Sequence, residues 1–357
     1  MKKLLMTQWL LLGFLLGGTS VQKDPFADVK VNLITDPQPT HYAEKVGALK
    51  RVHTIPPDIS DEVFLAQVGH IQADGEGNIY VYDNAQQTIF KFDREYRFVK
   101  TFIRAGKGPG ENSPIKSSRD FRVGPDGYLY FADTGNWKMM KYSLEGEFIG
   151  EWKFPKTVMF YPLPLGEGRE WLTYTARAFG YLNRETMTGL PLLTIRDLTD
   201  KLLSDPGYLH MADCWVDYFG SDTCALVDPD SAQFFLFRDH RMQRRFRIIP
   251  RRWIQGIKER MKRSKNDSGS HYPFFAGFFV DRDRPGTFYI AGTAISGKVS
   301  NPLYRFDTRG KLISAWGYPE EKDENNPVYL SYKCKRNGLI YATDYDQVLI
   351  FKEEECN

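Results

Sequence analysis

Short apolar runs that alternate with turn residues recur along the chain and predict β-strands. Four of these runs follow a glycine and share the pattern Gly-x-(Ile/Leu/Phe)-Tyr, which places Tyr80, Tyr130, Tyr289 and Tyr341 in register. A second strand-like run follows each copy, at 89–93, 139–143, 303–307 and 348–352. Paired strands at such regular positions indicate that the chain repeats one structural unit.

Two weaker copies fill the gap of 159 residues between Gly127 and Gly286. They lie at 168–176 with 192–197, and at 224–228 with 234–239. Six multi-stranded copies of roughly 40–50 residues predict an all-β, six-bladed β-propeller. The last copy lacks its outer strand, whereas the strand-like segment 30–55 has no partner. We therefore expect the N-terminal segment to close the ring, which removes both free sheet edges.

The first twenty residues have the features of a secretion signal. Lys2 and Lys3 precede an apolar run over 4–16, and the small residues 17–20 follow it. The run is shorter than the roughly 20 residues that a membrane-spanning helix needs. We expect a signal peptide over 1–20 and a single propeller domain over 21–357. The protein should be exported, to the periplasm or the exterior, and soluble. It should not be a lipoprotein, because no cysteine lies near the expected cleavage site.

The clearest copy, "FADTGNWKMMKYSLEGEFIGEW" (131–152), resembles an NHL repeat, which reads Asp-Thr/Ser-x-Asn, then apolar and basic residues, then an Asp/Glu-Gly turn. With "AGKGPGE" (105–111) between the first two copies, the chain also resembles a family of uncharacterised secreted six-bladed propeller proteins of bacteria. The resemblance implies the fold and an exported location. Some six-bladed relatives are lyases or lactone hydrolases that hold a metal on the ring axis.

Repeated residues are expected to serve the architecture. Asp83 and Asp133 end the first strand of their copies and are predicted to accept bonds from backbone N–H groups of the next turn. The tyrosines in register are predicted to pack between blades, because a ligand rarely needs several equal contacts.

Candidate chemistry lies where the innermost strands of a propeller converge on its central channel. Alignment on the repeated glycine places His70, Asp120 and Ser331 at matching positions. His70, Arg119 and Asp120 are therefore predicted binding residues at one channel mouth, where they could hold an anion or polarise a substrate. The alternative is a hydrogen-bonded polar plug. No two histidines match in blade position and no metal motif is present, so no metal ligands are assigned.

Positive charge is concentrated in one segment. The whole chain carries +3, but 241–265 holds eleven Lys and Arg residues and one acid. We expect a basic, partly helical insertion over 241–272, before the fifth blade, with a basic surface formed by Arg251, Arg252, Lys258, Arg260, Lys262 and Arg263. It could meet an anionic membrane surface or polysaccharide, or lie against the acidic remainder of the chain. Nucleic acid is not an expected partner of an exported protein.

The cysteines leave two readings open. An exported chain with an even number of cysteines can form disulfides, and the local pairs would be Cys214–Cys224 and Cys334–Cys356. Four unpaired thiols are the alternative.

Together these features predict a monomeric binding or scaffold module that engages a protein or glycan partner at one mouth of the ring, without a cofactor. The alternative is a metal-dependent lyase or hydrolase at the channel mouth, with Zn²⁺ or Ca²⁺ as its metal. Whether the protein is an enzyme is left open, with binding favoured.

Overall fold

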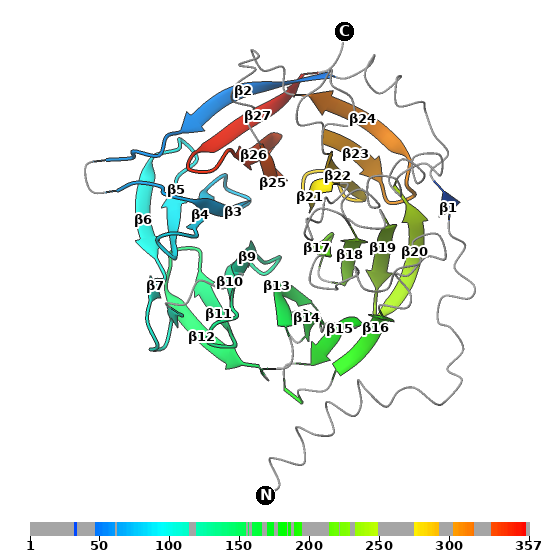
Figure 1. The fold of residues 1–357 in the computed structure, drawn as a ribbon, viewed down its shortest axis with the longest axis horizontal. Coiled ribbons are helices and arrows are strands. Elements are labelled where there is room, and N and C mark those ends of the chain that lie inside the picture. The colour runs from blue at the N-terminus through cyan, green and yellow to red at the C-terminus, as the bar shows by residue number, and fades with distance from the viewer. Residues whose placement is uncertain are drawn as a thin grey trace, which may run out of the picture.

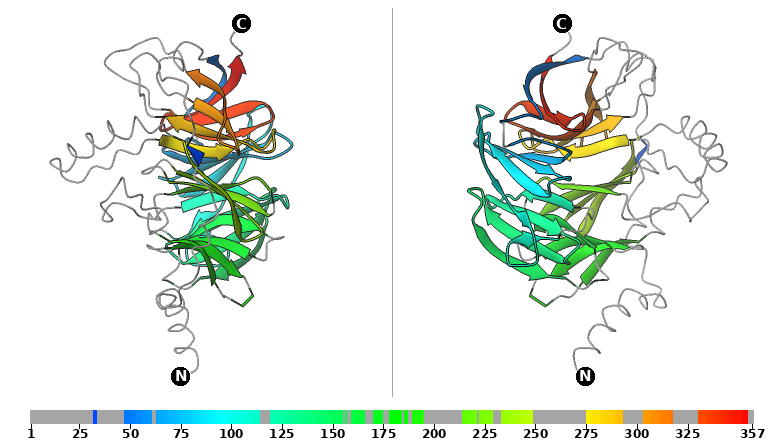
Figure 2. Two further views of the ribbon diagram at one scale, coloured as in Figure 1. Left: turned by 90° about the vertical axis from the view of Figure 1, so that its right-hand side faces the viewer. Right: turned by 60° about the vertical axis from the view of Figure 1, so that its left-hand side comes forward.

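A computed structural model shows that the described residues form six four-stranded blades around a central axis (Figure 1). The structure describes residues 32–33, 47–60, 63–113, 119–154, 156, 159–165, 170–174, 178–183, 185–186, 189–194, 214–220, 222–228, 233–248, 275–292, 303–317 and 330–354. Seen from the side, neighbouring blades lie next to one another, and their strands run across the thickness of the ring (Figure 2). The predicted six-bladed β-propeller is confirmed.

In the first three blades the strands follow one another from the axis to the rim. Blade one contains β3 (Val68–Ala73), β4 (Ile79–Asp83), β5 (Thr88–Phe92) and β6 (Phe98–Phe102). Blade two contains β9 (Arg119–Val123), β10 (Tyr128–Asp133), β11 (Lys138–Ser143) and β12 (Phe148–Lys153). Blade three contains β13 (Met159–Leu165), β14 (Glu170–Tyr174), β15 (Ala178–Asn183) and β16 (Gly189–Thr194). The short pair β7 (Arg104–Ala105) and β8 (Glu111–Asn112) lies between blades one and two.

The last three blades repeat this order, with N-terminal residues added to two of them. Blade four contains β17 (Trp215–Tyr218), β18 (Thr223–Asp228), β19 (Gln233–Arg238) and β20 (Arg241–Arg247), with β1 (Asn32–Leu33) added in parallel at its rim. Blade five contains β21 (Phe275–Val280), β22 (Thr287–Gly292), β23 (Leu303–Asp307) and β24 (Leu312–Gly317). Blade six contains β25 (Ser331–Arg336), β26 (Leu339–Thr343), β27 (Val348–Glu354) and β2 (Gly47–Ile55).

The N-terminal strand β2 completes the final blade, which confirms closure by the segment 30–55, although Asn32 and Leu33 of that segment pair with blade four instead. It pairs antiparallel with β27 along its length, from Ala48 opposite Glu354 to Ile55 opposite Val348. At its start it also pairs in parallel with β24, through Gly47 and Ala48. Blades five and six therefore share one eight-stranded sheet.

Apolar layers between neighbouring blades form the core. Every residue of β4 is buried. Tyr80 and Tyr82 lie in the cluster shared with blade two, and Ile79 and Val81 lie in the cluster shared with blade six. Because successive side chains of a strand point to opposite faces, alternate residues of one strand pack against two different neighbouring blades. This arrangement explains why the second strand of each blade is apolar at nearly every position.

The tyrosines in register pack between blades, as predicted. The Tyr80 hydroxyl donates to Asp74 Oδ2 at 2.9 Å and lies 3.3 Å from the carbonyl oxygen of Leu144 in blade two. The Tyr130 ring packs edge-on against Trp171 of blade three, with ring centroids 5.4 Å apart. Both tyrosines are buried, so their repetition serves the blade interfaces.

The two aspartates that end β4 and β10 hold turns together, which confirms their predicted role. Asp83 is fully buried, and its carboxylate accepts bonds from four backbone N–H groups, those of Ala66, Gln67, Ala85 and Gln86. Asp133 does the same with the N–H groups of Ser113, Gly135 and Asn136. Each carboxylate thereby ties the turn after its own strand to the segment that enters the blade.

The predicted basic insertion was placed too early. Residues Arg241–Arg247 form β20, the outer strand of blade four. Arg241 and Arg244 are exposed and Phe246 is buried, as expected for a strand with one solvent face. Residues 249–274 lie outside the described part of the chain, and they include the predicted helix and all six basic surface residues, Arg251, Arg252, Lys258, Arg260, Lys262 and Arg263. In the described ranges no helix is long and apolar enough to cross a membrane.

In blade three, one strand assignment was also wrong. The run 192–197 was expected to follow 168–176 directly in the sheet, but β15 lies between them. β14 pairs with β15, which follows it after a short connection. The start of the run 192–197 forms part of the rim strand β16.

The predicted disulfide Cys214–Cys224 is absent. Cys224 carries a free thiol, is completely buried, and lies with its Sγ 3.5 Å from the Tyr181 hydroxyl. The register pairs Cys224 with Tyr218. Tyr218 is four residues from Cys214, roughly 13 Å along a strand, whereas disulfides need Cα atoms within roughly 7 Å. Burial raises the pKa of Cys224 to about 12.

Cys334 is also a buried free thiol. It packs with Ile71 and Tyr341 in the apolar layer between blades six and one. Burial raises its pKa to about 12. Its predicted partner, Cys356, lies outside the described residues.

Candidate functional site

The inner strands place His70 and Asp120 at matching levels of the ring, as the glycine alignment predicts. His70 of β3 pairs with Tyr82, and Asp120 of β9 pairs with Ala132. Tyr82 and Ala132 each directly precede the aspartate that ends the second strand. Arg119 precedes Asp120 in β9, but the side chains of both lie outside the description. Their convergence with His70 therefore remains a prediction.

His70 reaches the neighbouring blade. Its ring lies edge-on to Phe121 of β9, with centroids 6.5 Å apart. His70 is half-buried. This contact places the imidazole between the inner strands of blades one and two.

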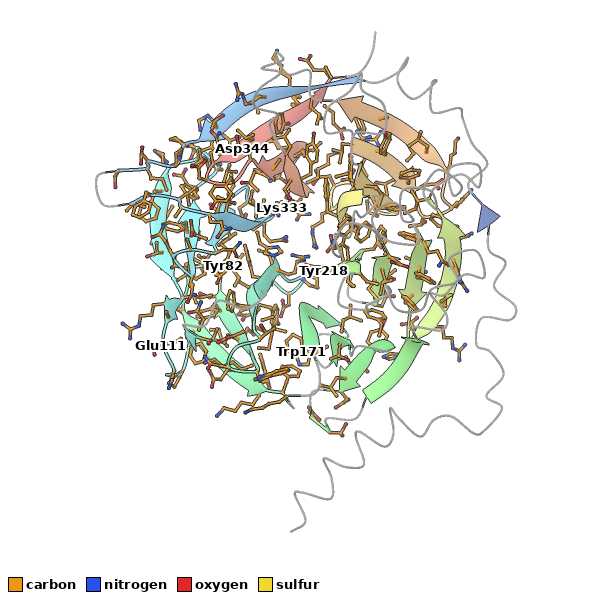
Figure 3. The ribbon with its side chains drawn as sticks, viewed as in Figure 1. Tyr82, Glu111, Trp171, Tyr218, Lys333 and Asp344 are labelled. Atoms are coloured by element: carbon orange, nitrogen blue, oxygen red, sulfur yellow. The ribbon has the colours of Figure 1, made fainter. Side chains whose placement is uncertain are left out.

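A second group of polar side chains meets on the axis, and sequence reasoning did not identify it. We call it the axial cluster, and it consists of Arg122 of β9, Asp217 and Tyr218 of β17, Lys333 of β25, and Arg282, which follows β21. Figure 3 shows Tyr218 and Lys333 at the inner ends of blades four and six. Residues of blades two, four and five are thus in contact near the axis, and Lys333 lies at the inner end of blade six.

Tyr218 links blade four to blade two across the axis. Its hydroxyl donates a hydrogen bond to the carbonyl oxygen of Val123, the residue after Arg122. Tyr218 is buried. Burial raises the pKa of Tyr218, although the nearby charges of Arg282 and Arg122 oppose this increase. The phenol therefore stays neutral and acts as a fixed hydrogen-bond donor.

Arg282 of blade five covers the Tyr218 ring. Its guanidinium carbon lies 3.9 Å from the ring centroid, a distance at which a cation is attracted to the aromatic face. Its Nη2 donates to Asp217 Oδ1 at 2.9 Å. Burial lowers the pKa of Arg282, but nearby groups, among them the carboxylate of Asp217, raise it overall, so the side chain remains a cation.

Asp217 positions this arginine. Its second oxygen, Oδ2, accepts the backbone N–H of Val280 in β21 at 2.9 Å. The side chains of Arg282 and Asp217 are only 16% and 7% exposed. A carboxylate with both oxygens bonded holds the guanidinium in one place, which favours a preorganised site.

The cluster has an excess of positive charge. Arg122, Lys333 and Arg282 are cations, and Asp217 is the one carboxylate within the cluster as defined. Arg122 and Lys333 are partly exposed.

The metal-dependent alternative would need several convergent ligands. Among the described residues, no three His, Cys, Asp or Glu side chains gather closely enough to hold a metal ion. The glycine-rich loop 105–111 does not offer a phosphate cradle either. The loop's own Glu111 accepts the N–H of Gly108 at 2.9 Å, and a Cβ on Gly106 would lie 2.0 Å from its carboxylate.

One spacing in the sequence could have revealed part of the axial cluster. Arg122 and Asp217 each lie eleven residues before the aspartate that ends the next strand, Asp133 and Asp228. They therefore occupy the same level of the ring, opposite Tyr130 and Ala225. Arg122 also lies two residues after Asp120, on the same face of β9.

Comparison with known proteins agrees with this architecture. A protein-family model described as a 6-bladed beta-propeller, DUF5128, matches residues 42–186. This range extends from before the closing strand β2 into blade three. The chain is a six-bladed β-propeller. No curated protein sequence matches it.

Two solved structures from Bacteroides share the fold. A Bacteroides fragilis protein that is described as exported aligns with a TM-score of 0.53 and 14% identity, over 92% of this chain and 99% of that one. A member of the DUF4221 family from Bacteroides vulgatus aligns with a TM-score of 0.55 and 11% identity, over 88% and 99%. At these identities the similarity supports the propeller fold alone.

Proposed function

We propose that this propeller is an exported, monomeric binding or scaffold module. It engages a protein or glycan partner at one mouth of the ring, and it uses no cofactor. The observation that supports this function is the axial cluster, in which Asp217, Tyr218 and Arg282 link blades two, four and five through bonds between blades. Ligand sites in ring-shaped folds are commonly built by loops and residues at such a convergence.

Export is supported by two observations. The chain begins with a basic pair and an apolar run of the kind found in signal peptides. A Bacteroides fragilis protein with the same fold is described as exported. The NHL-like pattern at 131–152 fits a binding module in this setting, and the basic residues of 251–263 would add attraction to an anionic surface.

The proposal can be tested with arrays for both partner classes. Purified protein is applied to a glycan array and to a displayed peptide library. The double variant Arg122→Gln with Lys333→Gln is compared with Arg309→Gln, which removes an exposed charge from a turn in blade five. We expect a ligand that the native protein and Arg309→Gln both retain, and that the double variant loses.

Two outcomes would overturn this function. Equal binding by all three proteins would place the partner elsewhere on the molecule. Conversion of a bound glycan to cleaved or unsaturated product, measured by chromatography, would instead favour the enzymatic alternative.

A further inference from the structure

Two aromatic side chains are exposed on one face of the ring, away from its rim. Most of the exposed large apolar side chains in the described ranges belong to rim strands: Val52, Val99, Phe148, Ile149 and Ile313. The remaining two are Tyr345, 63% exposed in the turn between β26 and β27, and Phe64, 48% exposed in the segment that enters β3. We call Phe64 and Tyr345 the aromatic pair. Asp344, which precedes Tyr345, is labelled in Figure 3.

The fold brings the aromatic pair to the same part of this face. The carbonyl oxygen of Tyr345 accepts the N–H of Val68 at 2.6 Å. Phe64 lies four residues before Val68, so at most about 14 Å of extended chain separates it from this bond. Both residues lie where the inner strands begin, whereas Tyr218 ends β17 and Arg282 follows the end of β21. The aromatic pair is therefore a separate site from the axial cluster.

The backbone of Tyr345 is strained. Its φ is 120°, whereas the other described non-glycine residues with positive φ have values between 48° and 69°, close to the left-handed helical region. A φ of 120° is unfavourable for a bulky side chain. The bond to Val68 and a bond from the Tyr345 N–H to Thr343 Oγ1, at 3.2 Å, hold the backbone in this conformation. Strain of this kind is found at ligand sites, where the surrounding structure fixes a residue before the ligand arrives.

The backbone of Phe64 is also fixed. Phe64 forms an antiparallel bridge with Asp58, and its carbonyl oxygen accepts the side-chain amide of Gln86 in blade one. The next residue, Leu65, is buried at 2% exposure and anchors the segment in the core. Because both rings stand on fixed backbone, a ligand that covers them loses little free energy in ordering the protein.

The polar side chains next to the aromatic pair are carboxylates and amides. Asp58 and Gln86 contact the backbone of Phe64, and both are at least partly exposed. Asp346 and Gln347 follow Tyr345 and are also partly exposed. Carboxylates accept hydrogen bonds, and amides both donate and accept them. This combination suits a ligand with many hydroxyl groups, whereas the two carboxylates would repel an anion.

We infer that Phe64 and Tyr345 form a binding site for a neutral oligosaccharide. The C–H faces of its sugar units pack on the two aromatic rings, and its hydroxyls bond to the neighbouring carboxylates and amides. The separation of the two rings favours a ligand of several sugar units over a single sugar. This inference goes beyond the proposed function, because it places a carbohydrate site on the face opposite the axial cluster.

Calorimetric titration of the chain 21–357 tests the site. The neutral probes are arabinoxylan, galactomannan, mixed-linkage β-glucan and glycogen, and polygalacturonate is the anionic comparison. We expect at least one neutral polysaccharide to bind more tightly than polygalacturonate, with an affinity that changes little between about 20 mM and about 150 mM NaCl, since the contacts carry no net charge. Phe64→Ala should weaken this binding by about tenfold, as expected for an aromatic hot spot.

Replacing Tyr345 with Gly separates binding from folding. The variant should lose binding by about tenfold or more, yet melt at no lower temperature than the native protein, because relief of backbone strain offsets the greater freedom of Gly in the unfolded chain. Ile149→Ala is the matched control, since it removes an apolar side chain that is 52% exposed on the rim of blade two, and it should bind as the native protein does.

Three results would overturn the inference: no binding of any neutral polysaccharide, equal affinity of the Tyr345, Phe64 and Ile149 variants, or a large loss of thermal stability in Tyr345→Gly. A displayed peptide that binds in place of a polysaccharide and is lost in Tyr345→Gly would assign the surface to a protein partner instead. The double variant Arg122→Gln with Lys333→Gln should bind the polysaccharide normally. Failure of the carbohydrate site would therefore leave the function proposed for the axial cluster untouched.

Discussion

At the scale of single residues, glycines allow turns that other residues resist. The repeated glycines Gly77, Gly127, Gly286 and Gly338 all have positive φ values, between 74° and 91°. Gly127 has a φ of 75°, and no atom lies within 4 Å of the place where a Cβ would be. A side chain there would have room, so its cost would come from the backbone conformation alone.

Replacing Gly127 with Val should therefore destabilise the protein by about 1–2 kcal/mol, because a β-branched residue is strained in the left-handed region. His70→Ala should cost less, since His70 is half-buried and alanine leaves the backbone conformation of β3 unstrained. Urea unfolding followed by fluorescence measures both. Gly127→Asn is the matched control and should retain most of the stability, because Asn tolerates this conformation. Equal losses for Val and for the His70 variant would contradict the assignment of this turn.

Individual residues also show where sequence reasoning succeeds and where it stops. Asp83 and the register tyrosines could be interpreted correctly because their roles are local and repeat from blade to blade. Arg282 could not, because its position over Tyr218 depends on how blade five packs against blade four. Cys224 was paired with the nearest cysteine along the chain, although strand register separates the two.

At the scale of elements, an ion network joins the strands of blades five and six. Lys335 of β25 donates to the Tyr289 hydroxyl at 2.7 Å and to Asp281 Oδ2 at 3.2 Å. It also pairs with Glu353 of β27 at 3.3 Å. The side chains of Lys335 and Asp281 are 3% and 0% exposed. Removal of one partner would leave a buried charge without compensation.

Lys335→Met should therefore lower the free energy of unfolding by about 3 kcal/mol. The matched control is Lys50→Met on β2, whose ion pair with Glu354 is exposed at 64% and 50% of the two side chains. That change should cost less than about 1 kcal/mol. Chemical denaturation of both variants gives the comparison. Similar small losses would mean that water already reaches the network.

Element boundaries were predictable where hydrophobic alternation was clear. All four strong Gly-x-x-Tyr runs became the second strand of a blade. The strand Arg241–Arg247 was missed because its charge suggested an insertion, although Phe246 faces the core in the manner of an outer strand. The basic residues of that strand lie on its exposed face, and their number obscured the apolar residue on its buried face.

At the scale of the whole molecule, closure of the ring depends on β2. Its residues Leu49 and Ile55 are buried at 1% and 2% exposure. Without β2, the last strand β27 would present an unpaired edge, which promotes association between chains. The ring and its closure could be predicted from the sequence. Six copies of the unit were present, the last copy lacked its outer strand, and the N-terminal segment supplied a strand without a partner.

Truncation tests the role of this strand. A chain that begins at Gly47 keeps β2 and should remain a folded monomer by size-exclusion chromatography with light scattering. A chain that begins at Asp58 lacks β2 and should aggregate or lose its cooperative thermal transition. If the shorter chain were monomeric with an unchanged melting temperature, closure by β2 would be unnecessary for stability.

The pairing of β2 with β27 also sets a condition on when the protein can fold. β2 is the first long strand to be synthesised and its partner β27 is the last, so some three hundred residues must emerge before the two can pair. Contacts so distant in sequence form slowly. If the chain crosses a membrane by its N-terminal end, the ring would close only after its last strand has emerged on the far side.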